Sequence, residues 1–184
     1  MMQNIHRTIL SCIACFVFSA NALAQQNNGP LAVPFGLYRD SVKAILLRQN
    51  CVQGFESNSY DNHYYVNYKN FYHSGDSCSL FLTFYKNKFA GYLIADYDQK
   101  KQAKSTFKHL KKDMKHQYGK PAAGNNTSER KTLTWTLTPA DDTSPKEVSI
   151  EMVTTSGNDP EILEQYICKE EYEWRQANPG QKMD

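Results

Sequence analysis

Hydrophobic and polar positions alternate with a period of two over much of the chain, and this pattern predicts a sheet-rich fold. In residues 60–73 the even positions carry mainly tyrosine and the odd positions are largely polar, which predicts a half-buried antiparallel strand. Residues 79–85 and 89–97 are apolar on both faces and flank a short Lys-Asn-Lys loop, so they predict a central hairpin. Residues 131–138 and 147–153 alternate again and predict a second hairpin that is open to water on one face.

Two segments instead have the period of an amphipathic helix. Apolar residues at 42, 45 and 46 predict a short helix over about residues 39–49, and a longer apolar stripe predicts a helix that Gly119 and Pro121 end. The stripe consists of Ala103, Phe107, Leu110, Met114 and Tyr118. Residues 122–130 predict a loop, and the segment from 157 to 176 favours a short strand followed by a helical tail.

These elements together predict one α+β domain, with an antiparallel sheet of about five to six strands and helices packed on one face. No internal repeat is visible in the residues.

The first 24 residues have the composition of a cleavable signal peptide. Arg7 precedes an apolar run, and Ala22 and Ala24 have the spacing that signal peptidase recognises. Cleavage after Ala24 predicts a periplasmic or secreted domain of residues 25–184, flexible at 25–34 and 177–184. A lipoprotein anchored at Cys12 is the alternative. Only four residues separate Cys12 from Arg7, fewer than the ~7–15 of an apolar signal region.

The net charge indicates which partners the protein is expected to bind, and the cysteines indicate which disulfide it is expected to form. The charge of +2 falls to +1 without the signal peptide, which holds one basic and no acidic residue, so nucleic acid is not an expected partner. In an oxidising compartment two of the three remaining cysteines are expected to pair. Cys51 and Cys78 are the favoured disulfide, because they flank the tyrosine-rich stretch, and Cys168 is then expected as a buried thiol.

Residues 61–76 contain two histidines and two aspartates, which are the residue types of a zinc site. On an extended strand, however, His63 and His73 would lie roughly 33 Å apart, so we expect solvated histidines on a strand face and in a turn. His109 and His116 are two helical turns apart, or ~10.5 Å, which is too far for one metal ion. The sequence therefore predicts neither a metal nor a cofactor.

Motifs of catalysis are also missing from the sequence after residue 24. It contains no Gly-x-Ser-x-Gly, His-Glu-x-x-His, Cys-x-x-Cys or glycine-rich phosphate loop. Adjacent carboxylates occur at 141–142 and 170–171, but neighbouring side chains on a loop or helix point apart and make poor acid–base pairs. An enzyme is therefore not expected.

Lysines and tyrosines are the remaining signals. Seven lysines between residues 100 and 115 lie opposite the apolar stripe, which predicts a solvated outer face or, alternatively, contact with an anionic partner or membrane surface. Twelve tyrosines exceed what a core of this size needs, and exposed tyrosines are favoured contact residues at protein interfaces. The candidate partner-binding residues are Tyr64, Tyr65, Tyr68 and Tyr72. Half-buried sheet residues are the alternative interpretation.

The segment PFGLYRDSVKAIL resembles the opening of small exported bacterial domains of the BamE (SmpA/OmlA) and beta-lactamase-inhibitor-protein type. Gly36, Leu37, Val42 and Ile45 are in register with their pattern, whereas Tyr38 stands where a hydroxyl residue usually caps the helix. FLTFYKNKFAGYLI, a helix ending in YGKP and a following Trp strand are also similar to periplasmic proteins of this layout. The resemblance implies an α+β module whose concave sheet binds other proteins, with no catalytic residues to transfer.

The expected function is therefore that of an exported, non-catalytic protein that binds a protein of the cell envelope through an aromatic sheet face. An inhibitor, an immunity-type protein and an envelope-assembly accessory all fit. The alternative is a small periplasmic hydrolase or ligand carrier with a pocket between sheet and helix. A closed pocket lined by histidine and carboxylate would favour the alternative.

Overall fold

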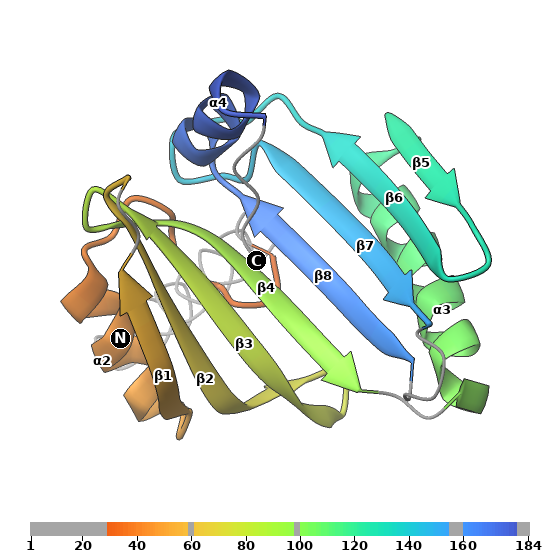
Figure 1. Ribbon diagram of the computed structural model, residues 1–184, viewed down its shortest axis with the longest axis horizontal. Coiled ribbons are helices and arrows are strands. Elements are labelled where there is room, and N and C mark those ends of the chain that lie inside the picture. Colours follow the sequence, from red (N-terminus) through yellow and green to blue (C-terminus); the bar gives the residue numbers. More distant parts are fainter. Residues whose placement is uncertain (1–28, 59–60, 98–99, 155–159, 180–184) are drawn as a thin grey trace, which may run out of the picture.

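The computed structural model describes residues 29–58, 61–97, 100–154 and 160–179. In these residues one antiparallel sheet of eight strands carries three helices (Figure 1). The helices are α2 (Arg39–Arg48), α3 (Lys100–Tyr118) and α4 (Lys169–Ala177). The strands are β1 (Val52–Asn58), β2 (His63–His73), β3 (Asp76–Tyr85), β4 (Lys88–Tyr97), β5 (Ala123–Asn126), β6 (Arg130–Thr136), β7 (Glu147–Val153) and β8 (Glu161–Ile167).

The predicted α+β class, the antiparallel pairing and the final strand followed by a helix are confirmed. The predicted count of five to six strands is wrong. Much of the expected loop at 122–130 forms β5, a short edge strand, and the segment after α2 forms β1 at the opposite edge. Both strands are mostly exposed, so their sequences lack the alternation by which buried strands are recognised.

The same order of elements occurs twice along the chain. A helix and a four-stranded meander, α2 and β1–β4, are followed by a second helix and meander, α3 and β5–β8. The last strands of the two meanders pair with each other, which gives the order β1-β2-β3-β4-β8-β7-β6-β5. The repetition is therefore architectural, although no repeat is visible in the residues.

Helices α2 and α3 pack on one face of the sheet, which we call the covered face; the other is the open face, seen from the front in Figure 1. Met114 of α3 lies 4.0 Å from the Tyr166 hydroxyl, and the Arg39 guanidinium of α2 lies 4.3 Å from the centre of the Tyr64 ring. The covered face holds most of the core, including Leu80, Leu82, Phe84, Tyr92, Ile94, Trp135, Val148, Ile150 and Tyr166.

Helix α4 does not share the covered face. Its Arg175 reaches Gln165 on the open side of β8, with 3.4 Å between Nη1 and Oε1, and its Trp174 ring lies 4.2 Å from that of His63 on β2. The expectation that the helices pack on one face thus holds for α2 and α3 and is wrong for α4. This helix closes one end of the open face.

The segment before α2 belongs to the core, contrary to the predicted flexibility of residues 25–34. Leu31, Val33 and Phe35 are buried, and the Phe35 ring stacks on Phe89 with 5.1 Å between centroids. The signal peptide, the remainder of the predicted N-terminal arm and the last five residues of the predicted C-terminal one lie outside the described residues. Within the described ranges, no helix is long and apolar enough to cross a membrane.

Helix α2 begins without a side-chain cap, as expected from Tyr38. The tight turn between β3 and β4 supplies an acceptor instead, because the Arg39 N–H donates to the Asn87 carbonyl at 3.2 Å. Lys86 and Asn87 have φ angles of 50° and 65°, the left-handed conformation that a two-residue hairpin turn requires. The turn therefore forms the hairpin and also fixes the start of α2.

The predicted disulfide is not formed: Cys51, Cys78 and Cys168 are buried thiols, and no disulfide occurs among the described residues. Cys51 directly precedes β1 and Cys78 lies in β3, so β2 runs between their strands. Two strand spacings amount to about 9–10 Å. This exceeds the ~4.4–6.8 Å between Cα atoms that a disulfide spans.

Candidate functional site

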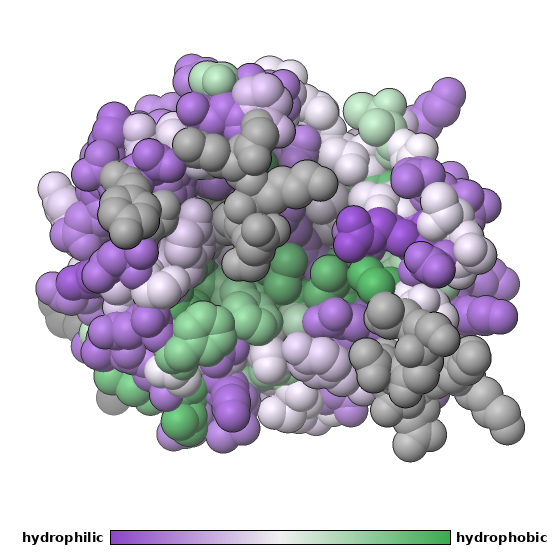
Figure 2. Space-filling model, in the orientation of Figure 1, coloured by the Kyte–Doolittle hydropathy of each residue, from purple (hydrophilic) through white to green (hydrophobic). Residues whose placement is uncertain are grey.

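A groove of about 650 Å³ crosses the open face over β1 to β4 and β8. Its apolar lining comes mainly from Phe55, Phe81, Leu93 and Leu163, and the Phe55 and Phe81 rings lie 6.3 Å apart. Arg175 of α4 lines it as well. Figure 2, which views this face, shows an apolar band across its middle.

Beside and beyond the groove the open face carries three carboxylates and Arg130, whose Nε lies 2.5 Å from Glu151 Oε1. β7 presents Glu147 and Glu151 there, and Glu161 of β8 belongs to the groove lining. Burial raises the pKa of Glu147 although Arg175 opposes the shift, and burial likewise raises the pKa of Glu151 against the effect of Arg130. The open face thus joins an apolar groove to a polar flank in which Glu151 is paired with Arg130.

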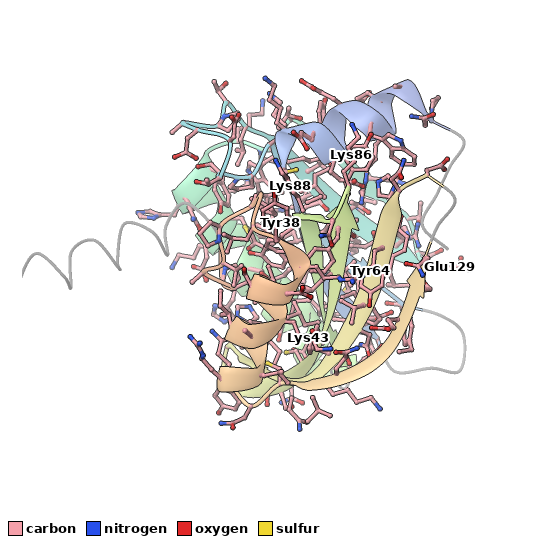
Figure 3. All side chains as sticks on the ribbon, turned by 90° about the vertical axis from the view of Figure 1, so that its left-hand side faces the viewer. Tyr38, Lys43, Tyr64, Lys86, Lys88 and Glu129 are labelled. Atoms are coloured by element: carbon pink, nitrogen blue, oxygen red, sulfur yellow. The ribbon has the colours of Figure 1, made fainter. Side chains whose placement is uncertain are left out.

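The four candidate tyrosines do not form one surface. Tyr68 is 2% exposed in the core, and Tyr64 lies between β2 and α2, as Figure 3 shows. Tyr64 donates a hydrogen bond to the Glu56 carboxylate, and burial followed by this bond raises the pKa of Tyr64 to about 12. Tyr65 points to the open face and lines the groove, and Tyr72 is 73% exposed outside it.

A β-bulge in β2 explains why Tyr72 does not share a face with Tyr64 and Tyr68, although all three occupy even positions. The register of β2 against β3 shifts between Tyr68 and Phe71, and Asn70 has a φ of 61°. Beyond the bulge Phe71 turns into the core opposite Cys78, and Tyr72 turns to the open face. A single unpaired residue therefore reverses which positions are buried.

His63 is not solvated, contrary to the sequence interpretation, but forms a buried ion pair with Glu171 of α4. Its Nε2 lies 2.9 Å from Glu171 Oε2, and its Nδ1 lies 3.2 Å from the Asp61 carbonyl oxygen. Both ring nitrogens of His63 therefore lie within hydrogen-bond distance of an oxygen atom. Arg175 Nε donates to the other carboxylate oxygen of Glu171 at 2.7 Å.

The Glu171 carboxylate therefore contacts His63 of β2 and Arg175 of α4, and through His63 it joins α4 to the sheet. It lies in the first turn of α4, where the helix dipole also favours a negative charge. Glu171 is buried, so its charge depends on these partners for compensation.

His73 forms a second pair, on the covered face. Its Nε2 lies 2.8 Å from Glu164 Oε1, and the Tyr166 hydroxyl donates to Glu164 Oε2 at 3.3 Å. Burial lowers the pKa of His73, but the hydrogen bond and charge of Glu164, with the charge of Asp96, outweigh it and raise the pKa overall.

These groups do not assemble into a catalytic triad. The Ser74 hydroxyl lies 3.2 Å from His73 Nε2, the same nitrogen that contacts Glu164, so the imidazole cannot relay a proton between them. Burial raises the pKa of Cys168 to about 11, which disfavours the thiolate. In the described residues, no group of three or more histidine, cysteine, aspartate or glutamate side chains could hold a metal ion.

The long helix α3 presents five of its lysines to solvent, at positions 104, 108, 111, 112 and 115. His109 and His116 are exposed on this helix, which ends at Tyr118, directly before Gly119 as predicted. Of the seven lysines, 104, 108 and 111 line a second cavity with Lys131 of β6. No local pattern could have identified this cavity or the two histidine pairs, because their partners come from distant segments.

No family model, curated protein or solved structure matches this chain. The resemblance of its opening segment to BamE-like and inhibitor-type domains therefore stays a prediction.

Proposed function

We propose that this protein is an exported, non-catalytic binding protein that recognises another protein through the open face of its sheet. The observation that carries the proposal is the groove of about 650 Å³ with its floor of Phe81, Leu93 and Leu163. Interfaces draw most of their binding energy from a few large side chains that fill such depressions, surrounded by polar residues.

The chemistry of the open face indicates what the partner presents. An aromatic or aliphatic side chain fits the groove, and a basic residue beside it complements Glu147 and Glu161. The exposed ring of Phe55 at the rim adds contact area from an edge strand. The roles proposed for the protein are those of an inhibitor, an immunity-type protein or an envelope-assembly accessory.

Site-specific photo-crosslinking in the cells that produce the protein tests the proposal. A photoreactive phenylalanine analogue replaces Phe55 in one variant and Tyr72 in another. Both side chains are exposed aromatics on the sheet, but only Phe55 lines the groove. We expect a cross-linked protein from position 55 and none, or a much weaker one, from position 72.

The variant Phe55→Ser should then lose capture of the cross-linked partner, and Tyr72→Ser should keep it. Equal capture by both variants, or no adduct from position 55, would show that the groove is not the contact surface.

A further inference from the structure

A second cavity, of about 370 Å³, lies between α3 and the outer strands β5 to β7, on the covered side of the sheet. Phe107, Leu133 and Met152 form its apolar floor. Lys104, Lys108, Lys111 and Lys131 surround this floor together with the amides of Asn125 and Asn126. Its volume is within the range of small-molecule sites, about 300–1,000 Å³.

The four lysines come from two separate elements. Lys104, Lys108 and Lys111 follow one another at helical spacing on α3, so they lie along one side of that helix. Lys131 has the same parity on β6 as Leu133 and Trp135, and it therefore points from the strand toward α3. Lys131 thus occupies a position of β6 at which the alternation of apolar and polar residues predicts an apolar side chain.

The charges of these four lysines have no ion-pair partner among the carboxylates that the structure describes. Like charges that converge around an apolar floor repel one another, and a bound anion relieves this repulsion. The floor at the same time favours a hydrocarbon group over water.

We propose that this cavity binds a single-chain amphiphile with a carboxylate head group, such as a fatty acid. The hydrocarbon chain lies on Phe107, Leu133 and Met152, and the carboxylate accepts hydrogen bonds from the surrounding lysines. The site is on the opposite side of the sheet from the groove, so it is independent of the proposed protein partner.

Binding of laurate to the full mature protein, measured by calorimetry below the micellar concentration, tests the proposal. Dodecanol has a similar chain and a neutral head, and acetate has the head without the chain. We expect laurate to bind at least about tenfold more tightly than either, because both the charge-assisted bonds and the apolar contact contribute. Equal affinity for laurate and dodecanol would refute a role for the lysines.

Variants locate the site. Lys131→Met and Lys108→Met should each weaken laurate binding by about tenfold. Lys112→Met removes the same charge from an exposed position of α3 that does not line the cavity, and it should change affinity by less than about twofold. Urea unfolding of each variant checks that the fold is intact, and Lys108, which is exposed, provides the test if Lys131→Met does not fold.

Vesicles distinguish the cavity from a charged surface. If the protein binds phosphatidylglycerol vesicles but not laurate, or if Lys112→Met weakens binding as much as Lys108→Met, the lysines act as a diffuse membrane-facing charge and the proposal is wrong. Laurate binding that only the cavity variants weaken supports it.

Discussion

Replacing Glu171 by glutamine tests how α4 is held on the sheet. Oε2 of the carboxylate contacts His63 Nε2 and Oε1 accepts from Arg175 Nε, at 2.9 and 2.7 Å. Glutamine keeps the shape but replaces one of the two acceptor oxygens by an NH2 group, so it cannot accept hydrogen bonds at both positions. The substitution also leaves the Arg175 guanidinium beside a neutral residue.

The burial of the pair sets the size of the effect. The side chains of His63 and Glu171 are 0% and 1% exposed. Removing one partner of a buried pair costs about 3–5 kcal/mol of unfolding free energy. Total stabilities are about 5–15 kcal/mol, so the variant can still fold. With a urea slope near 2 kcal/mol per M, the midpoint should fall by about 2 M.

Urea unfolding followed by tryptophan fluorescence is the assay, since the Trp174 ring packs 4.2 Å from His63 and reports on α4 directly. Glu173→Gln is the matched control on the same helix. Glu173 lies 4.0 Å from Lys169, both side chains are more than half exposed, and the change should cost less than about 0.5 kcal/mol. A difference below about 1 kcal/mol between the two variants would refute the reasoning about the buried pair.

Three further outcomes are expected. The pKa of His73 is higher in the folded protein than the value of about 6.5 in the unfolded chain. Its pairing with Glu164 therefore stabilises the folded state fully at a pH below about 6.5, and this stabilisation is lost as the pH rises through the pKa of the folded protein. Urea titrations across this range should show the loss in the wild type and not in His73→Gln, and parallel pH profiles would contradict it. Tyr68→Ala should cost about 3–5 kcal/mol and Tyr72→Ala less than about 0.5, by thermal unfolding; similar losses would show that Tyr68 is not a core residue. Cys168 should resist iodoacetamide in the native protein and react in urea, as followed by mass spectrometry, and rapid native labelling would contradict its burial.

Local sequence patterns predicted those helices and strands in which burial of one face requires apolar residues at regular intervals. The stripe of α3, the central hairpin and the alternation of β6 and β7 all have buried partners that select their residues. The predicted Lys-Asn-Lys loop of that hairpin is shorter than expected, because Lys88 pairs with Tyr85 and leaves only Lys86 and Asn87 in the turn. Edge strand β5, with all four residues exposed, has no such constraint, and its sequence is that of a loop.

The candidate site depended on information that no short segment contains. Whether Tyr64 is covered or open depends on where α2 docks, and the side that Tyr72 faces depends on the bulge at Asn70. The pairing of His63 with Glu171 joins residues 108 positions apart. The alternation of tyrosine and polar residues in β2 predicted that the strand has two different faces, but it did not indicate which of them the helices cover.

The junction of the two meanders has a consequence for folding order. Of the seven ladders in the described sheet, six join strands adjacent in the sequence, and only β4–β8 joins distant ones, with Gly91 opposite Ile167. The entropy cost of closing a long loop is therefore concentrated at this one ladder, so each meander is expected to form early and the junction late. The groove takes Phe81 and Leu93 from the first meander and Leu163 from the second, so it is complete only after the junction closes. A partner bound in the groove would then stabilise the pairing of β4 with β8. Amide hydrogen exchange should slow more in these two strands than in the edge strands.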